Sequence, residues 1–161
     1  IGVKPDILAF GKKMQVCGIL AGKRIDEVKD NVFQKSGRIN STWGGNLADM
    51  YRATWYLRII EDEKLVENAD KVGAHLLNKL QELTKDFVQV TNVRGAGLMI
   101  AFDLPTEQLR DAVHKKTPEF GLLVLKCGEK TIRLRPALNL TMAEADMGVE
   151  RIAKALKEIL K

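Results

Sequence analysis

The sequence predicts an α/β protein whose last part is a compact α+β domain, and three observations support this fold class. In residues 1–45, short apolar runs at 7–10 and 18–21 are separated by loops, as expected of strands and connections taken from a larger α/β sheet. In residues 46–86, apolar side chains recur at spacings of three and four, which is typical of two amphipathic helices. In residues 87–161 the apolar period changes to two, and the expected elements follow the order ββαββα.

The helices are predicted from their apolar stripes and from their first residues. One is expected from about residue 46 to residue 61, after a brief polar helix near residues 26–31. The next carries a stripe that we interpret as core packing, formed by Leu65, Ala69, Val72, Leu76, Leu80 and Leu83. Another follows from about Thr106. The last begins at Thr141, where Thr-Met-Ala-Glu predicts a capping box with Glu144.

The strands of the last part are predicted from alternation of apolar and polar residues at 87–90, 97–103 and 122–125. The segment Thr-Ile-Arg-Leu-Arg-Pro at 131–136 predicts a further strand, with Ile132 and Leu134 on one face and both arginines on the other. Guanidinium groups bind carboxylates bidentately, so Arg133 and Arg135 are candidates for a carboxylate receptor. The alternative interpretation is a half-exposed strand with a solvated basic face.

Composition indicates a folded intracellular protein and excludes several other classes. With 161 residues, of which 45% are apolar and 29% charged, the chain can bury the core of about one domain. No apolar run approaches the roughly 20 residues that span a bilayer, so we expect no membrane segment and a cytoplasmic location. Cys17 and Cys127 lie far apart and are expected to be reduced thiols. His75 and His114 lack acidic or cysteine partners at ligand spacing, so no metal site is expected.

The net charge of +5 raises the question of nucleic-acid binding. The 26 Lys and Arg residues are interleaved with 21 acidic residues along the expected helices and are not gathered into a stripe. Aromatic residues make up only 6% of the chain and do not alternate with basic ones. We therefore expect a solvated basic surface and no nucleic-acid partner.

A candidate nucleophile follows the first apolar run. The segment Ile-Leu-Ala-Phe-Gly-Lys-Lys brings Lys12 onto a glycine turn at the end of an expected strand. An enzyme that uses a lysine for Schiff-base chemistry can hold the amine at such a position. A solvated surface lysine is the alternative interpretation, and Lys13 is the rival for the same role.

A candidate phosphate site precedes the first long helix. The segment Asn-Ser-Thr-Trp-Gly-Gly-Asn at 40–46 places hydroxyl groups, Thr42 among them, and flexible backbone at the expected helix N-terminus. Unpaired N–H groups and the positive end of the helix dipole attract phosphate there. The alternative interpretation is an ordinary capped helix after a loop.

Taken together, these three segments resemble the C-terminal part of class III, ω-aminotransferase-type, pyridoxal-phosphate aminotransferases, and the resemblance covers essentially the whole chain. It implies fold type I, with residues 1–45 as a remnant of the large-domain sheet, 46–86 as connecting helices and 87–161 as the α+β small domain. By the resemblance, Lys12 holds pyridoxal 5'-phosphate covalently, Thr42 binds the cofactor phosphate of a neighbouring subunit, and Arg133 binds the substrate α-carboxylate. A homodimer with shared active sites is implied.

Within the class, the segments Phe-Gly-Lys-Lys-Met-Gln-Val-Cys-Gly, Asn-Ser-Thr-Trp-Gly-Gly-Asn and Arg-Leu-Arg-Pro are most similar to the lysine 6-transaminase branch. That branch implies transfer of the terminal amino group of L-lysine to 2-oxoglutarate. The chain departs from the broader class at residues 14–18, where a glycine-rich run and a proline are usual, and at Leu47, where proline is common. Another ω-aminotransferase, of the 4-aminobutyrate or ornithine type, is therefore kept as an alternative.

The segments that such enzymes carry upstream are absent, including the acidic partner of the pyridine nitrogen and the glycine/serine phosphate loop. We therefore expect a C-terminal fragment that is inactive alone and that exposes part of an apolar interface in residues 1–60. A non-catalytic interaction module is the alternative from another class. Arg94, in the expected turn at 93–97, is assigned to the turn or to an internal ion pair and not to substrate.

Overall fold

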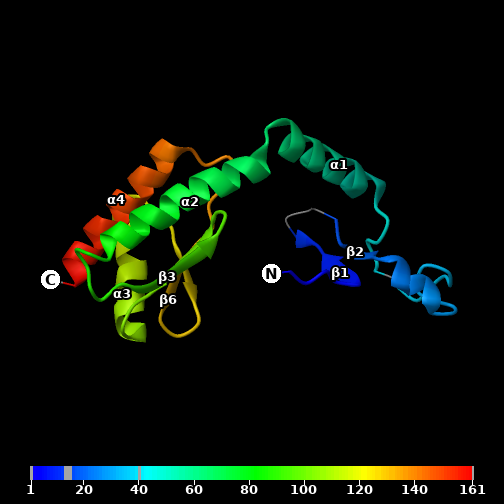
Figure 1. Cartoon of the computed structure of the whole chain (residues 1–161), viewed down its shortest axis with the longest axis horizontal. Coiled ribbons are helices and arrows are strands. Elements are labelled where there is room, and N and C mark those ends of the chain that lie inside the picture. The colour runs from blue at the N-terminus through cyan, green and yellow to red at the C-terminus, as the bar shows by residue number, and fades with distance from the viewer. Residues whose placement is uncertain (1, 13–15, 40, 161) are drawn as a thin grey trace. The chain divides into compact units, whose positions relative to one another are not determined.

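The computed structural model describes residues 2–12, 16–39 and 41–160 (Figure 1). The chain forms two compact units, residues 1–62 and residues 63–161. The first thus includes the first long helix, and the second begins just before the next one. The three-part division at residues 45 and 86 stays a prediction.

The first unit contains a two-stranded antiparallel sheet, a short 3-10 helix and one long α-helix. Strands β1 (Ile7–Phe10) and β2 (Gly18–Ala21) confirm the two apolar runs, and they pair from Ile7 with Ala21 to Phe10 with Gly18. The polar helix expected near 26–31 lies earlier, as η2 (Lys23–Glu27). It stops there because the buried Asn31 amide donates to the carbonyls of Ile25 and Val28, at 2.9 and 3.1 Å, and closes the chain into a turn.

The long helix of this unit, α1 (Leu47–Asp62), agrees with the expected range but buries little. Among the described residues of the unit, Ala53 is the one buried apolar side chain. Large apolar side chains lie exposed on α1 and before it, among them Phe33, Trp43, Leu47, Tyr51, Trp55 and Leu57. The expected exposure of apolar surface in residues 1–60 is confirmed. Clustered exposed apolar side chains of this kind are typical of surfaces that other polypeptide covers.

The second unit is an antiparallel sheet covered by helices on one face. Its elements are α2 (Leu65–Leu83), β3 (Thr91–Ala96), β4 (Met99–Asp103), α3 (Glu107–Lys116), η3 (Thr117–Phe120), β5 (Leu125–Cys127), β6 (Thr131–Leu134) and α4 (Met142–Ile159). The strand order is β3-β4-β6-β5, and the predicted ββαββα order is confirmed. Thr141 and Glu144 form the predicted capping box at the start of α4.

The core of this unit lies between the helices and one face of the sheet. Ile100, Phe102 and Ile132 point to this face and are at most 1% exposed. They pack with the predicted α2 stripe, including Leu76 and Leu80, and with apolar residues of α3 and α4. The alternate residues of β4 and β6 lie on the opposite face of the sheet, here called the open face.

Two of the predicted strands are displaced. Residues 87–90 form a turn, closed by a hydrogen bond from the Val90 amide to the Phe87 carbonyl at 2.9 Å, and the strand follows at 91–96. Alternating burial at a turn resembles a strand pattern, whereas β3 contains Gly95 and owes its conformation to pairing with β4. Similarly, 122–125 precedes most of β5, because only Leu125–Cys127 pairs with β6.

Helix α2 approaches the turn between β3 and β4 very closely at Gly73. A Cβ atom at Gly73 would lie 2.2 Å from the Gly97 carbonyl oxygen, and Gly97 itself has a positive φ of 52°. A glycine therefore allows the helix to lie directly on the turn.

Replacing Gly73 by alanine should destabilise the second unit by about 1–3 kcal/mol, because backbone atoms on both sides would have to move apart. Gly148 in α4 is the matched control, since a Cβ there meets nothing within 4 Å. Gly148→Ala should instead stabilise by about 0.4–1 kcal/mol. Urea unfolding of the two variants measures both effects, and equal shifts would contradict the packing argument.

Candidate active site

Lys12 lies two residues after the end of β1, next to the point where the β1–β2 pair ends. Phe10 pairs with Gly18, and the Cys17 sulfur packs so closely on Gly11 that a Cβ atom at Gly11 would lie 2.9 Å from it. Lys12 is exposed and has a φ of 52°, a conformation that L residues adopt infrequently. The paired strands therefore hold the backbone just before Lys12, and Lys12 itself is accessible to solvent. Lys13, the rival, lies outside the described residues.

The segment around Thr42 forms a turn before α1. The Gly44 amide donates to the Ser41 carbonyl at 2.9 Å, and Thr42 is exposed. The Asn46 side-chain oxygen accepts from the amides of Ala48 and Asp49, at 2.9 and 3.3 Å. Asn46 thus caps the helix, as the alternative interpretation has it. Two of the first-turn amides expected for a phosphate are already bonded, so a phosphate at this segment would depend on Thr42 and the turn.

Arg133 lies in the middle of β6, between Ala101 of β4 and Leu125 of β5. The predicted alternation is confirmed, since Ile132 and Leu134 are buried on the helix side. The Nε atom of Arg133 is buried and, in the part of the chain that the structure describes, has no hydrogen-bond partner. A buried unpaired donor is costly, so this nitrogen is suited to an anionic ligand.

A cavity of about 300 Å³ adjoins this arginine at the end of the sheet. Its walls come from β6, from the segment before β5 and from the first half of α4, and they are mainly apolar. Arg133 and Arg135 both line it, but Arg135 follows the end of β6 and is exposed. Of the two candidate receptors, Arg133 is the one held by the sheet.

A second polar cluster lies on the open face of the sheet around Asp103, and the sequence analysis missed it. The Asp103 carboxylate accepts from Thr131 Oγ1 at 2.6 Å, from Asn92 Nδ2 at 2.8 Å and from Arg94 Nη1 at 3.1 Å. Burial alone would raise the pKa of Asp103. The three hydrogen bonds and the charge of Arg94 outweigh it and hold the pKa below its ordinary value of 3.8. The internal ion pair expected for Arg94 is confirmed.

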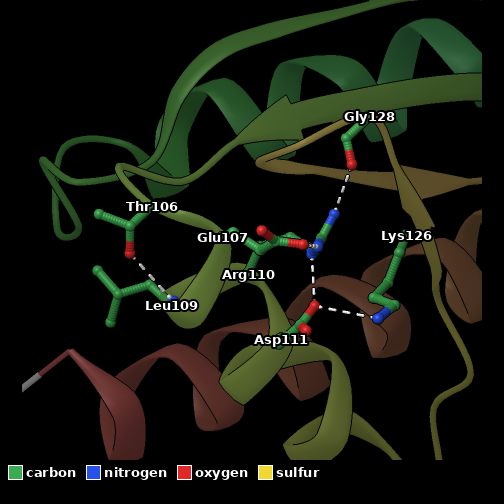
Figure 2. A network of polar contacts seen from close by, with 7 residues as sticks. All are labelled: Thr106, Glu107, Leu109, Arg110, Asp111, Lys126 and Gly128. Atoms are coloured by element: carbon green, nitrogen blue, oxygen red, sulfur yellow. Dashed lines mark hydrogen bonds and ion pairs between the residues drawn. The ribbon is translucent and has the colours of Figure 1, made fainter.

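The hairpin that carries Arg133 is anchored to α3 by a buried arginine (Figure 2). The Arg110 side chain is 3% exposed, and it donates to the Gly128 carbonyl at 2.7 Å, to Asp111 at 2.6 Å and to Glu107 at 2.8 Å. Lys126 of β5 also pairs with Asp111, at 3.2 Å. These contacts join α3 to β5 and to the first residue of the β5–β6 turn.

Replacing Arg110 by alanine should destabilise the second unit by about 1–3 kcal/mol, because it removes a buried side chain and leaves the Gly128 carbonyl without this donor, whereas Glu107 and Asp111 remain partly solvated. Lys79→Ala is the control, since Lys79 is half exposed and lies 3.9 Å from Glu82. Exposed pairs of this kind contribute about 0–1 kcal/mol. Thermal or urea unfolding measures the difference, and a loss at Arg110 no larger than that at Lys79 would be contrary to this expectation.

The surroundings of the histidines, the cysteines and the helices bear on possible metal and membrane sites. His75 has an acidic partner that its sequence spacing did not reveal, because its Nε2 lies 2.7 Å from Asp146 of α4. Within residues 2–12, 16–39 and 41–160, no group of three or more His, Cys, Asp or Glu side chains could hold a metal ion. Among the same residues no helix is long and apolar enough to cross a membrane, and both cysteines are free and exposed.

Comparison with known proteins identifies the family. The model of the aminotransferase class-III family matches residues 1–156. The chain belongs to this family. Pyridoxal phosphate is the cofactor of the family, and the predicted α/β fold of such aminotransferases is confirmed. Lys12 and Thr42 lie in the first unit and Arg133 in the second, and their roles stay predictions.

Relatives of known activity are similar over almost the whole chain. L-lysine-epsilon aminotransferase of Mycobacterium tuberculosis is 48% identical over 157 residues, which are 97% of this chain and 35% of that protein. Ornithine aminotransferase of Plasmodium falciparum is 36% identical over 162 residues, or 97% of this chain and 38% of that protein. A solved structure of lysine aminotransferase from M. tuberculosis in the internal aldimine form superposes with a TM-score of 0.93 at 48% identity, covering 98% of this chain and 37% of that one. The chain thus spans about a third of the length of these relatives.

Proposed function

We propose that the protein containing this chain transfers the terminal amino group of L-lysine to 2-oxoglutarate, with pyridoxal 5'-phosphate as its cofactor. The observation that carries the proposal is the difference in identity between two kinds of relative over nearly the same residues. Identity is 48% to a lysine ε-aminotransferase and 36% to an ornithine aminotransferase. The alternatives are an ω-aminotransferase of the ornithine or 4-aminobutyrate type, and a non-catalytic interaction module.

The residues of the first unit fit the cofactor in their chemistry. Lys12 offers a primary amine on an exposed loop, and Thr42 offers a hydroxyl group on an exposed turn. We expect Lys12 to hold the cofactor covalently and Thr42 to bind the phosphate of the cofactor in a neighbouring subunit. When bound, the cofactor serves as the electron sink for bonds at the amine-bearing carbon. The Lys12 amine, once freed by the substrate amine, then moves the proton at that carbon.

We expect Arg133 to orient the substrate in the active site. A guanidinium with an unpaired, buried Nε can bind the α-carboxylate of lysine, and this fixes one end of the substrate. The opposite end then presents the terminal amine for reaction, and the same arginine is available to a carboxylate of 2-oxoglutarate in the return half of the reaction. Arg135 is the second candidate for this contact.

We further propose that the active protein is a homodimer and that these 161 residues do not transaminate alone. Exposed apolar side chains in residues 1–60 support both statements, because they leave a surface that further polypeptide would cover. The second statement is also supported by the span of the chain, which is about a third of the length of its relatives. A cytoplasmic location stays a prediction.

The test measures glutamate formation by the full-length protein from 2-oxoglutarate with L-lysine, L-ornithine or 4-aminobutyrate as donor. Lysine and ornithine differ by one methylene, for which a fitted site discriminates about 10- to 200-fold in kcat/KM. We expect lysine to be preferred by such a factor, and the 161-residue chain to form no glutamate. Preference for either other donor would reject the substrate assignment, and activity of the isolated chain would reject its dependence on further polypeptide.

A further inference from the structure

The open face of the sheet in the second unit carries two arginines, Arg94 and Arg133, and one carboxylate, Asp103. Arg94, Ala101 and Arg133 lie side by side across β3, β4 and β6, as the strand register shows. Asp103, two residues after Ala101, lies on the same face and pairs with Thr131. It is therefore a diagonal neighbour of Arg133, at about 7–8 Å between backbone positions, a separation that a long side chain can bridge.

Of the two arginines, the Asp103 carboxylate is hydrogen-bonded to Arg94. Asp103 bonds Arg94, Asn92 and Thr131, all at 3.1 Å or less, whereas Arg133 has a buried Nε without a partner. Asn92 reaches Asp103 because β3 is irregular between Thr91 and Arg94, where Asn92 takes a positive φ of 51°. Ala101, which lies between the two arginines, has only a methyl group as its side chain and therefore separates them little.

We propose that Arg94 is a positioning residue for Arg133, because by holding Asp103 together with Asn92 and Thr131 it keeps that carboxylate from pairing with Arg133. The inference rests on the proposed function, in which Arg133 binds a substrate carboxylate. An internal carboxylate and a substrate carboxylate compete for the same guanidinium, so whatever frees Asp103 weakens substrate binding. The low pKa of Asp103 keeps it ionised at neutral pH, so the competitor is always charged.

The test uses the full-length, cofactor-loaded protein and two readouts. One is the separation of KM from kcat with L-lysine. The other is the dissociation constant of hexanoate by calorimetry, since hexanoate has one carboxylate and neither an amine nor a keto group. Arg94→Gln should raise both KM and this dissociation constant on the order of tenfold, with kcat little changed. Arg94→Lys, which keeps a charge beside Asp103, should remain near the wild type.

The double variant Arg94→Gln/Asp103→Asn decides the mechanism. Removing the competing charge should restore hexanoate binding to the wild-type value, whereas a structural role of Arg94 would leave it impaired. The inference is overturned if Arg94→Gln binds hexanoate as tightly as the wild type does. It is also overturned if the double variant binds hexanoate as weakly as Arg94→Gln does. The variant Arg133→Ala distinguishes failure of this inference from failure of the proposed function. If it binds hexanoate as the wild type does, the carboxylate role of Arg133 is wrong and the inference falls with it. If Arg133→Ala loses hexanoate binding while Arg94→Gln binds hexanoate as the wild type does, only the inference is wrong.

Discussion

Replacing Lys12 by alanine in the full-length protein should abolish transamination. The variant loses the amine that we expect to hold the cofactor and to move the proton at the substrate carbon, and one positioned acid–base group alone contributes about 10²- to 10⁴-fold. Glutamate formation from L-lysine and 2-oxoglutarate measures the loss. The paired strands beneath Lys12 keep their contacts in the variant, so we expect the fold to survive.

Lys13→Ala is the control for this experiment, because it removes the neighbouring amine and should leave most of the activity. Equal losses for the two variants would contradict the assignment to Lys12. Activity that survives in Lys12→Ala would contradict the Schiff-base role as a whole.

Arg133→Ala should weaken use of L-lysine by about 2–5 kcal/mol, the scale for removing one partner of a buried charge pair. This corresponds to roughly 30- to 5,000-fold in kcat/KM. The loss should fall on substrate capture, because cofactor attachment depends on the first unit. Cadaverine, which is lysine without its carboxylate, should be used equally by the variant and the wild type, and this comparison isolates the carboxylate contact.

Arg135→Ala is the matched control for Arg133. Arg135 is exposed at the end of β6, and solvated charge pairs contribute about 0–1 kcal/mol, so we expect a much smaller loss. A larger loss at Arg135 than at Arg133 would transfer the carboxylate role to Arg135. Equal losses with lysine and cadaverine would show that Arg133 acts through folding.

Local interactions explain why much of the fold could be predicted from the sequence. The capping box of Thr141 with Glu144 joins residues three apart, and the α2 stripe has a fixed helical period, so both are visible in a short window. The turn at 87–90 was mistaken for a strand because burial alternates there as it does in a strand. Whether a segment pairs depends on its partner, and β3 became a strand through pairing with β4.

Long-range pairing also limits what could be predicted of the site. Lys12, Thr42 and Arg133 were proposed from a family resemblance, and the structure adds their local settings. The Asp103 cluster depends on strand pairing over 28 residues and on an irregularity at Asn92, and neither has a local pattern in the sequence. The cap at Asn46 could have been predicted, because asparagine before a helix is a preferred N-cap residue.

The most direct test of the account is to find the residue that carries the cofactor. The full-length protein loaded with pyridoxal 5'-phosphate is reduced with borohydride, digested and mapped by peptide mass. The account predicts one modified lysine, Lys12, in the wild type and in Lys13→Ala, and none at this position in Lys12→Ala. An adduct on Lys13, or on neither lysine, would contradict the assignment on which the proposed function rests.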